Sequence, residues 1–504
     1  MPTTTPRRFL LLSTLFASLA LAQQPLQQAQ VEAIAQRAFA AFQPKGMALA
    51  VVQDGKLLQE LGLGERRAGS PVTARTLFNI ASCSKAFTAT LVAQLVREGK
   101  LGWNDRVVDR VPEFRMADPW ITAHMTIADL LSHRCGLVTF EGDLLWYDSD
   151  YDDAQVLARI EKLPITQRFR EQFGYQNLMY LVAGIALQRA TGSAWEDLVE
   201  ARILKPLGMQ DSRACAQRLP ADAERAFPHI DGHEVPDHEF VACKPAAAIY
   251  SSVHDLSLWI EYLLAGGKQD GVVDEAMLSE LWRPHVAMGA GTGSKPGDMR
   301  GYGMGWFLSL QDGKKLVEHD GGMPGFLSKV SLLPADKFGF VVLNNANDGV
   351  LNEAIKAALL AAHAGGDADA VIDRFAKIGE RVQARADAAV QKREAARITG
   401  TQPSLPLAAY AGRYEDAVYG PAEVRLDGEQ LHIVLLPGKR RLFGALSHWH
   451  QDVFRVDFPD RFLPFALVRF TLDVDGKVAG FRIDCPIADF DFAALDFRRT
   501  GSAN

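Results

Sequence analysis

Apolar residues in the first part of the chain follow two different periods. Helical spacing marks residues 30–42, and strand-type apolar runs mark residues 47–53 and 56–63. Asp54-Gly55 between these strands is a typical two-residue hairpin turn. Helical spacing then dominates from residue 82 to about residue 264. The pattern predicts a β-hairpin followed by a long helical segment.

Two capping boxes predict where helices begin inside this segment. In such a box, a Ser or Thr and an acidic residue three positions later each accept a hydrogen bond from the other's backbone N–H. The two sequences are Thr126-Ile127-Ala128-Asp129 and Ser193-Ala194-Trp195-Glu196. We expect one helix to start at each of them.

Strand patterns return after the helical segment. They cover residues 315–319, 325–333 and 338–344, and a helical pattern over 351–363 follows. Strands on both sides of a long helical insert indicate a single antiparallel sheet built from distant segments, with helices packed on it. The first two-thirds of the chain therefore reads as an α+β domain with an all-helical subdomain.

The last third of the chain has a different composition and a different apolar pattern. Residues 367–398 are charged, rich in alanine and free of proline, which predicts a helical linker. Between residues 407 and 499 the apolar positions form short alternating runs, and Asp427-Gly428 and Asp475-Gly476 supply hairpin turns. This segment is predicted to be a small all-β barrel or sandwich.

The first 22 residues have the pattern of a signal peptide. Arg7 and Arg8 form a charged head, residues 9–21 are an apolar run too short to span a bilayer comfortably, and Ala20-Leu21-Ala22 is a small-residue cleavage site. No later apolar run is long enough to predict a membrane span. We expect an exported protein, periplasmic or secreted.

Charge and cysteine content exclude some classes of function. The 504 residues carry a formal charge of −7, and a mildly acidic chain is not typical of a nucleic-acid-binding protein. The number of cysteines is odd, and their spacing matches neither a zinc site nor a C-x-x-C motif. We expect mostly buried thiols, and no disulfide pair can be chosen among Cys83, Cys135, Cys215, Cys243 and Cys485.

Ser82-Cys83-Ser84-Lys85 is the only S-x-x-K sequence in the chain. Helical spacing just downstream places Ser82 and Lys85 on one face at the start of a helix. An amine that is held neutral can accept the proton of a neighbouring hydroxyl and so activate it as a nucleophile. The N-terminus of the helix offers N–H groups where an oxyanion would form.

Tyr175-Gln176-Asn177 is the only Y-x-N sequence and directly precedes an apolar helical pattern. A phenol serves as a general base only when nearby cations lower its pKa. Lys85 is a candidate for that cation. The alternative interpretation is a tyrosine packed on a helix start and an asparagine that caps it.

His319-Asp320-Gly321-Gly322 ends a predicted strand. A histidine there can hydrogen bond with Tyr175 or with substrate, and the glycines would let substrate backbone approach closely. The N–H of Gly322 is a candidate second oxyanion donor beside that of Ser82. A second H-x-G sequence, at His363, follows a helical pattern and indicates a helix end.

Clustered histidines raise the alternative of a metal hydrolase. They are His229, His233 and His238, with Glu239 beside the last, and a second pair occurs at residues 448 and 450. Gly232 and Pro236 interrupt the first group, so that one helix cannot present it. Loop or barrel-surface positions are the favoured interpretation, rather than a zinc site.

The order of the three motifs resembles the serine β-lactamase and penicillin-binding-protein superfamily, in particular its class C-like branch. That branch uses S-x-x-K, then Y-x-N, then K-T-G or H-x-G on a strand. The resemblance runs from about residue 28 to residue 363. It includes the segments 100–112, 125–137, 206–209 and 302–306.

The resemblance also covers the C-terminal segment. Tyr410-Ala411-Gly412-Arg413-Tyr414 and the region of Trp449 are similar to the lipocalin-like β domain that is often appended to such hydrolases. The implied organisation is a signal peptide (1–22), a β-lactamase-like serine hydrolase domain (23–365), a helical linker (366–402) and a lipocalin-like β-barrel domain (403–504). The β domain is also a candidate surface for oligomer formation.

The resemblance implies an acyl-enzyme mechanism and a role for each motif residue. Ser82 would attack a carbonyl, and either Lys85 or Tyr175 would be the acylation base. Asn177 would orient Lys85 and the substrate amide. Substrate would also contact His319, Gly321 and Gly322, with the last completing the oxyanion hole. Water activated by Tyr175 would then release the acyl group, and no metal or organic cofactor would be needed.

One departure from the family pattern affects the expected substrate. Many relatives have lysine at the position of His319, a permanent cation for carboxylate-bearing β-lactams and D-Ala-D-Ala peptides. Histidine is mostly neutral at pH 7, so carboxylate recognition is weaker unless an arginine such as Arg300 substitutes. This favours an amide or ester hydrolase (a peptidase or esterase, with D-amino-acid peptides and cell-wall fragments among the candidate substrates). The alternatives are a true class C-like β-lactamase, a D-alanyl-D-alanine carboxypeptidase, or a penicillin-binding sensor that is acylated without turnover.

Overall fold

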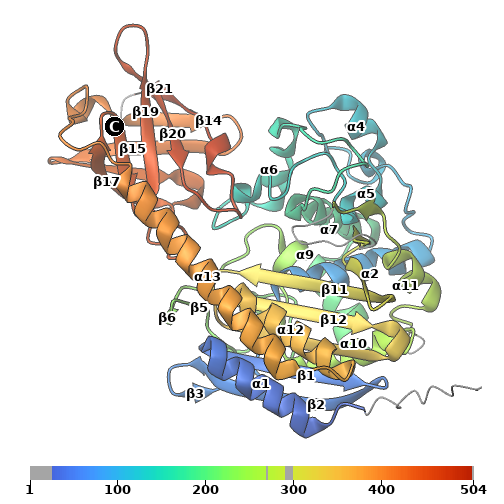
Figure 1. Cartoon of the computed structure of the whole chain (residues 1–504). Helices are drawn as coiled ribbons and strands as arrows, with labels where there is room; N and C mark the ends of the chain where they lie inside the picture. The colour runs from blue at the N-terminus through green and yellow to red at the C-terminus, as the bar shows by residue number, and fades with distance from the viewer. Residues whose placement is uncertain (1–24, 268–270, 290–298, 502–504) are drawn as a thin grey trace, which may run out of the picture.

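A nine-stranded antiparallel sheet lies at the centre of the first domain (Figure 1). The computed structural model describes residues 25–267, 271–289 and 299–501, so the predicted signal peptide lies outside the described residues. Strand order is β3-β2-β1-β13-β12-β11-β10-β9-β8. The strands span Gly46–Gln53 (β1), Lys56–Arg67 (β2), Ser70–Pro71 (β3), Val286–Ala287 (β8), Gly301–Tyr302 (β9), Phe307–Gln311 (β10), Lys314–Met323 (β11), Phe326–Leu333 (β12) and Phe338–Asn344 (β13).

The sheet joins strands from the two ends of the domain, as the sequence predicts. β1 pairs with β13, where Met47 lies opposite Asn344. β1 is apolar at nearly every position because both of its faces are covered. Met47 and Leu49 pack with helices α1 (Gln28–Phe42) and α12 (Gly349–His363), while the alternate residues belong to the core on the opposite face.

The helical segment forms the other side of the domain and includes α2 (Ser84–Arg97), on the opposite side of the sheet from α1 and α12 (Figure 1). α7 (Asn177–Thr191) is apolar around most of its circumference because it is buried. The remaining helices are α3 (Val107–Arg110), α4 (Pro119–His124), α5 (Ile127–Leu131), α6 (Asp153–Leu157), α8 (Trp195–Val199), α9 (Lys244–Ala247), α10 (Val253–Leu264) and α11 (Glu275–Leu281). Two short ladders join β4 (Phe78–Asn79) to β7 (Tyr250–Ser251) and β5 (His229–Ile230) to β6 (His233–Glu234).

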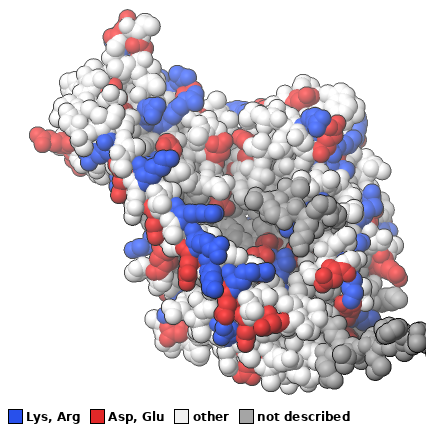
Figure 2. Space-filling view, viewed as in Figure 1, with Lys and Arg blue, Asp and Glu red and all other residues white. Residues whose placement is uncertain are grey.

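A long helix, α13 (Ala368–Ala395), connects this domain to the C-terminal part (Figure 1). Ile372 is its one buried residue, so the helix is largely exposed, as a charged linker helix should be. Figure 2 shows Lys and Arg side chains interspersed with Asp and Glu along this face of the molecule. α13 occupies the segment whose composition predicts a helical linker.

The C-terminal part is a closed eight-stranded antiparallel barrel. Its first and last strands pair with each other, so no strand edge is left open. Aromatic side chains fill the interior, among them Tyr414, Phe470 and Phe481. The strands span Gly412–Asp416 (β14), Gly420–Asp427 (β15), Gln430–Leu435 (β16), Phe443–His450 (β17), Val453–Val456 (β18), Ala466–Leu472 (β19), Val478–Asp484 (β20) and Phe497–Gly501 (β21).

Several expectations can now be compared with the fold. The α+β domain followed by a small β-barrel is confirmed. All five cysteines are buried and free. The capping box at Thr126 is present, but the one at Ser193 is wrong, because Ala194 is the N-cap and no side chain caps that helix. Among the described residues, no helix combines the length and apolar character needed to cross a membrane.

Candidate active site

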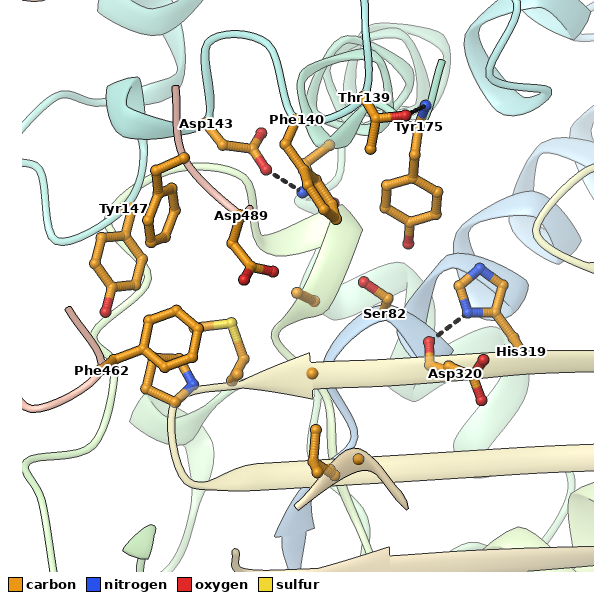
Figure 3. A pocket seen from close by; sticks show the side chains of 18 of the residues that line it. Ser82, Thr139, Phe140, Asp143, Tyr147, Tyr175, His319, Asp320, Phe462 and Asp489 are labelled. Carbon is orange, nitrogen blue, oxygen red and sulfur yellow. Dashed lines mark hydrogen bonds between the residues drawn. The ribbon is translucent and has the colours of Figure 1, made fainter. Parts of the chain in front are cut away.

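Ser82 lies in a single 3-10 turn, Ala81–Cys83, immediately before α2. Ala81 has a φ of 46°, a left-handed conformation that is strained for alanine. The Asn79 side chain supports this conformation by accepting a hydrogen bond from the Ala81 N–H at 2.7 Å. The strained turn directs Ser82 into a cavity, as Figure 3 shows.

Lys85 lies one helical turn below Ser82 and is fully buried. Its Nζ is 3.0 Å from Ser82 Oγ, 2.7 Å from Asn177 Oδ1 and 3.0 Å from the Ala246 carbonyl oxygen. Burial lowers the pKa of Lys85 to about 7, although Cys243 and Asp143 act in the opposite direction. A large fraction of the amine is therefore neutral near pH 7, with the serine hydroxyl in reach.

Tyr175 faces the same gap, but its phenol does not behave as the sequence predicts (Figure 3). Lys85 Nζ lies 4.8 Å from the centre of the Tyr175 ring. Burial raises the pKa of Tyr175 well above its usual value, and a hydrogen bond with Ser82 only partly opposes this. The expectation that Lys85 would lower the pKa of this phenol is wrong, because burial is the larger effect.

Asn177 connects Lys85 to a carboxyl group that the sequence analysis missed. Its amide nitrogen donates to Asp143 Oδ2 at 2.6 Å, and the Trp146 indole donates to Asp143 Oδ1 at 2.9 Å. Burial raises the pKa of Asp143 to about 7. Asp143 lies in a loop without periodic pattern, so the sequence held no signal for this hydrogen-bond chain.

His319 lies on β11 and is buried. Its Nε2 is 2.9 Å from Tyr302 Oη, and its Nδ1 is 2.6 Å from the Asp320 carbonyl oxygen. The partner is thus Tyr302 rather than Tyr175. Burial lowers the pKa of His319 to about 3, so the ring is neutral at physiological pH. Arg300 does not replace the missing cation, because it is exposed and does not line the cavity.

The two glycines of this motif differ in position. β11 continues to Met323, so both lie within the strand rather than beyond its end. Gly321 packs against the turn that carries Ser82, where an added Cβ would lie 2.2 Å from the Ile80 carbonyl oxygen. Gly322 lines the cavity, whereas Gly321 does not. Substrate contact therefore stays a prediction for Gly322 and has no support for Gly321.

The cavity that contains these groups has a volume of about 600 Å³. Ser82, Tyr175, Asn177 and His319 share it with aromatic side chains from loops on both sides (Figure 3). Three further lining residues come from the C-terminal barrel, which the sequence analysis did not connect with the site: Phe462, Asp489 and Phe490. The two domains therefore build one site together.

The clustered histidines do not form a common site. His229 Nδ1 is 2.7 Å from the Phe227 carbonyl oxygen, whereas His238 lies 3.3 Å from Asp148. Within residues 25–267, 271–289 and 299–501, no three His, Cys, Asp or Glu side chains are grouped as metal ligands.

Comparison with known proteins identifies the family. A family model described as Beta-lactamase matches residues 34–364. The chain belongs to the beta-lactamase family. A second model, described as a domain of unknown function (DUF3471), matches residues 396–499, which contain the barrel.

Proteins similar in sequence to this member of the beta-lactamase family include hydrolases and a penicillin-binding protein. "Unguisins hydrolase ungD'" of Aspergillus campestris is 30% identical over 60% of this chain and 58% of its own length. "Unguisins hydrolase ungD" of Aspergillus violaceofuscus is 28% identical over 80% of this chain and 78% of its own. "Penicillin-binding protein 4" of Amycolatopsis lactamdurans is 32% identical over 60% of this chain and 81% of its own. The chain thus spans somewhat more than half the length of the first of these relatives.

Solved structures share the fold. An octameric penicillin-binding protein homologue from Pyrococcus abyssi aligns over 94% of this chain and all of its own, with a TM-score of 0.61 at 20% identity. A class C beta-lactamase aligns over 65% of this chain and 93% of its own, with a TM-score of 0.55 at 20% identity. The first alignment extends through the C-terminal part of the chain.

Proposed function

We propose that this protein is an exported serine hydrolase that cleaves amide or ester bonds through an acyl-enzyme on Ser82. The observation that carries the proposal is the 3.0 Å separation of Ser82 Oγ from Lys85 Nζ, at the bottom of a cavity large enough for a small substrate. Export is supported by the charged head, apolar run and Ala20-Leu21-Ala22 sequence of the first 22 residues.

In the proposed acylation step, Ser82 Oγ attacks the substrate carbonyl carbon and its proton moves to neutral Lys85. The tetrahedral oxyanion is stabilised by the backbone N–H groups of Ser82 and Gly322. Collapse of this intermediate breaks the bond to the leaving amine or alcohol, which takes up the proton. Water then attacks the ester on Ser82, releasing a carboxylic acid and restoring the hydroxyl.

Lys85 is the better candidate for the acylation base. Its pKa is lowered to about 7 by burial, so that the neutral amine is abundant at pH 7 to 8. Tyr175 keeps its proton over this range because burial raises its pKa. We propose that Tyr175 acts as a hydrogen-bond donor during acylation and meets the incoming water during deacylation.

The neutral His319 favours substrates other than carboxylate-bearing β-lactams and D-Ala-D-Ala peptides. The relatives named as hydrolases of unguisins, and a fold neighbour, SurE, solved with D-Leu, support beginning a substrate search with short peptides. Both D- and L-residues belong in that search.

Turnover of an activated ester tests the proposal. We expect the wild-type protein to hydrolyse p-nitrophenyl acetate over many cycles and Ser82→Ala to lose this activity while keeping its thermal unfolding temperature. Activity that survives in Ser82→Ala would refute the proposed nucleophile. A stoichiometric burst without further turnover would instead indicate an acylated sensor.

A further inference from the structure

The C-terminal barrel forms part of the active-site wall. Phe462 lies in the loop between β18 and β19, and Asp489 and Phe490 lie in the loop between β20 and β21. All three line the cavity that holds Ser82, more than 370 residues earlier in the chain. In Figure 3, Asp489 and Phe462 stand across the cavity from Tyr175 and His319.

Direct contacts hold this wall against the hydrolase domain. Tyr147 Oη donates to Asp460 Oδ2 at 2.6 Å, and the Tyr147 ring packs on Phe490 with ring centres 4.2 Å apart. Arg441 Nε lies 3.1 Å from the carboxylate of Asp148, and both groups are largely buried. A buried ion pair and a buried hydrogen bond at one interface position the barrel loops firmly.

Asp489 differs from Asp143 and Asp320, the other two carboxyl groups that line the cavity, because no described side chain pairs with it. It forms neither an ion pair nor a side-chain hydrogen bond with any residue that the structure describes, and no described Lys or Arg lines the cavity. Burial raises the pKa of Asp489, and its charge in turn raises that of Asp143. This side of the cavity therefore carries acidic groups that no described Lys or Arg of the lining neutralises.

The surroundings of Asp489 suit an organic cation. Rings from both domains line the same space, and the faces of aromatic rings attract ammonium groups. These rings belong to Phe140, Trp146, Tyr147, Phe462 and Phe490. An anionic substrate would be repelled here, and a neutral one would leave the Asp489 carboxylate partly desolvated and unpaired.

We propose that Asp489 of the barrel binds an ammonium group of the substrate, so that the enzyme selects amides or esters with a free amino group close to the scissile bond. The proposal rests on the hydrolase function proposed above and adds the substrate class to it. It also gives the barrel a function, because the domain then supplies a specificity-determining residue to the neighbouring active site.

Two pairs of substrates that differ in one charge test the proposal. Phenylalanine p-nitroanilide, in both D and L forms, is compared with its N-acetyl derivative, which places the charge on the acyl side. 4-(Aminomethyl)phenyl acetate is compared with 4-methylphenyl acetate, which places the charge on the leaving group. The proteins are the wild type, Asp489→Asn and the control Asp475→Asn, which removes an exposed carboxylate at the tip of the β19–β20 hairpin.

In at least one pair we expect the wild type to favour the amine by about tenfold or more in kcat/KM. Asp489→Asn should bring this ratio close to one while changing the rate on the uncharged partner less than about twofold. Asp475→Asn should keep the ratio. The proposal would be overturned if the wild type showed no preference for the amine in either pair, or if the preference survived in Asp489→Asn. It would also be overturned if Asp489→Asn lost kcat/KM equally on both members of a pair.

A binding measurement separates this inference from the proposed reaction. Calorimetry with phenylalanine amide and N-acetylphenylalanine amide requires no turnover. We expect tighter binding of the free amine to the wild type, and equal binding of the two compounds to Asp489→Asn. Ser82→Ala should bind like the wild type even though it is inactive. If the wild type hydrolyses esters but binds both amides equally, the proposed hydrolase function is retained, and the proposed binding of an ammonium group by Asp489 is wrong.

Discussion

Polar groups on the two sides of the cavity differ in how they are hydrogen bonded. One side holds Ser82, and the C-terminal barrel supplies the other. On the first side, Lys85 has three hydrogen-bond partners and His319 has one on each nitrogen. On the barrel side, Asp489 is a carboxylate without a counter-ion among the described residues. The proposed reacting groups are thus held by hydrogen bonds within the protein, whereas the proposed recognition group, Asp489, has no partner among the described residues.

The difference has a physical reason. Groups that transfer protons work best when they need little reorganisation, so a buried and fully hydrogen-bonded arrangement favours catalysis. A group that selects a charged substrate gains most when its charge is compensated only in the complex.

The largest effect is expected from removing the nucleophile or its base. Ser82→Ala and Lys85→Met should each reduce kcat/KM for p-nitrophenyl acetate by about 10³-fold or more, because the hydroxyl is a weak nucleophile without a proton acceptor. Steady-state kinetics measures this loss, and circular dichroism checks that the fold is intact. Wild-type-like activity in a folded Lys85→Met protein would contradict the account.

The pH dependence should follow the neutral form of Lys85. Because burial lowers the pKa of Lys85 to about 7, we expect kcat/KM to fall about tenfold per pH unit below pH 7 and to level off above it. Asp143 acts to raise this pKa, so Asp143→Asn should move the profile to lower pH. A profile that is flat between pH 5 and 8 would remove Lys85 as the base.

Tyr175→Phe should be less damaging than Lys85→Met. The variant removes a hydrogen bond to the reacting hydroxyl but leaves the proposed base in place, so we expect a loss of about ten- to a hundredfold in kcat/KM. Comparing the two variants on one ester decides between the candidate bases. A loss in Tyr175→Phe that equals the loss in Lys85→Met would assign the phenol an equal part in acylation.

His319→Lys should have the smallest effect and should change substrate choice. A lysine there adds a cation opposite Asp489, so the ratio of kcat/KM for mono-p-nitrophenyl succinate over p-nitrophenyl butyrate should rise about tenfold. His319→Gln is the neutral control. An unchanged ratio in folded His319→Lys would show that residue 319 does not control carboxylate recognition.

The sequence predicts which of the candidate side chains come together, because each belongs to a short local motif. Ser82 and Lys85 are one helical turn apart, and Tyr175 and Asn177 stand at the start of a helix. Such spacing places side chains without knowledge of the tertiary fold. The strands at both ends of the domain likewise follow from local apolar runs and from turn residues such as Asp54-Gly55.

The remaining features depend on contacts between distant segments. Strand pairing brings Tyr302 to His319, and Asp143 reaches Asn177 from a loop without a pattern. The raised pKa of Tyr175 follows from burial, which only the assembled fold determines. Asp489 lies in another domain, so its place in the cavity depends on how the barrel docks. Local spacing carries no information on any of these.

Mass spectrometry of the acylated protein tests the central claim most directly. The protein is mixed with p-nitrophenyl acetate, quenched in acid within the first turnover and digested, and the modified peptide is sequenced. The account predicts one acetyl group on Ser82 in the wild type and none in Ser82→Ala. Turnover without an acetyl group on Ser82, or an acetyl group on Tyr175 or a cysteine instead, would contradict it.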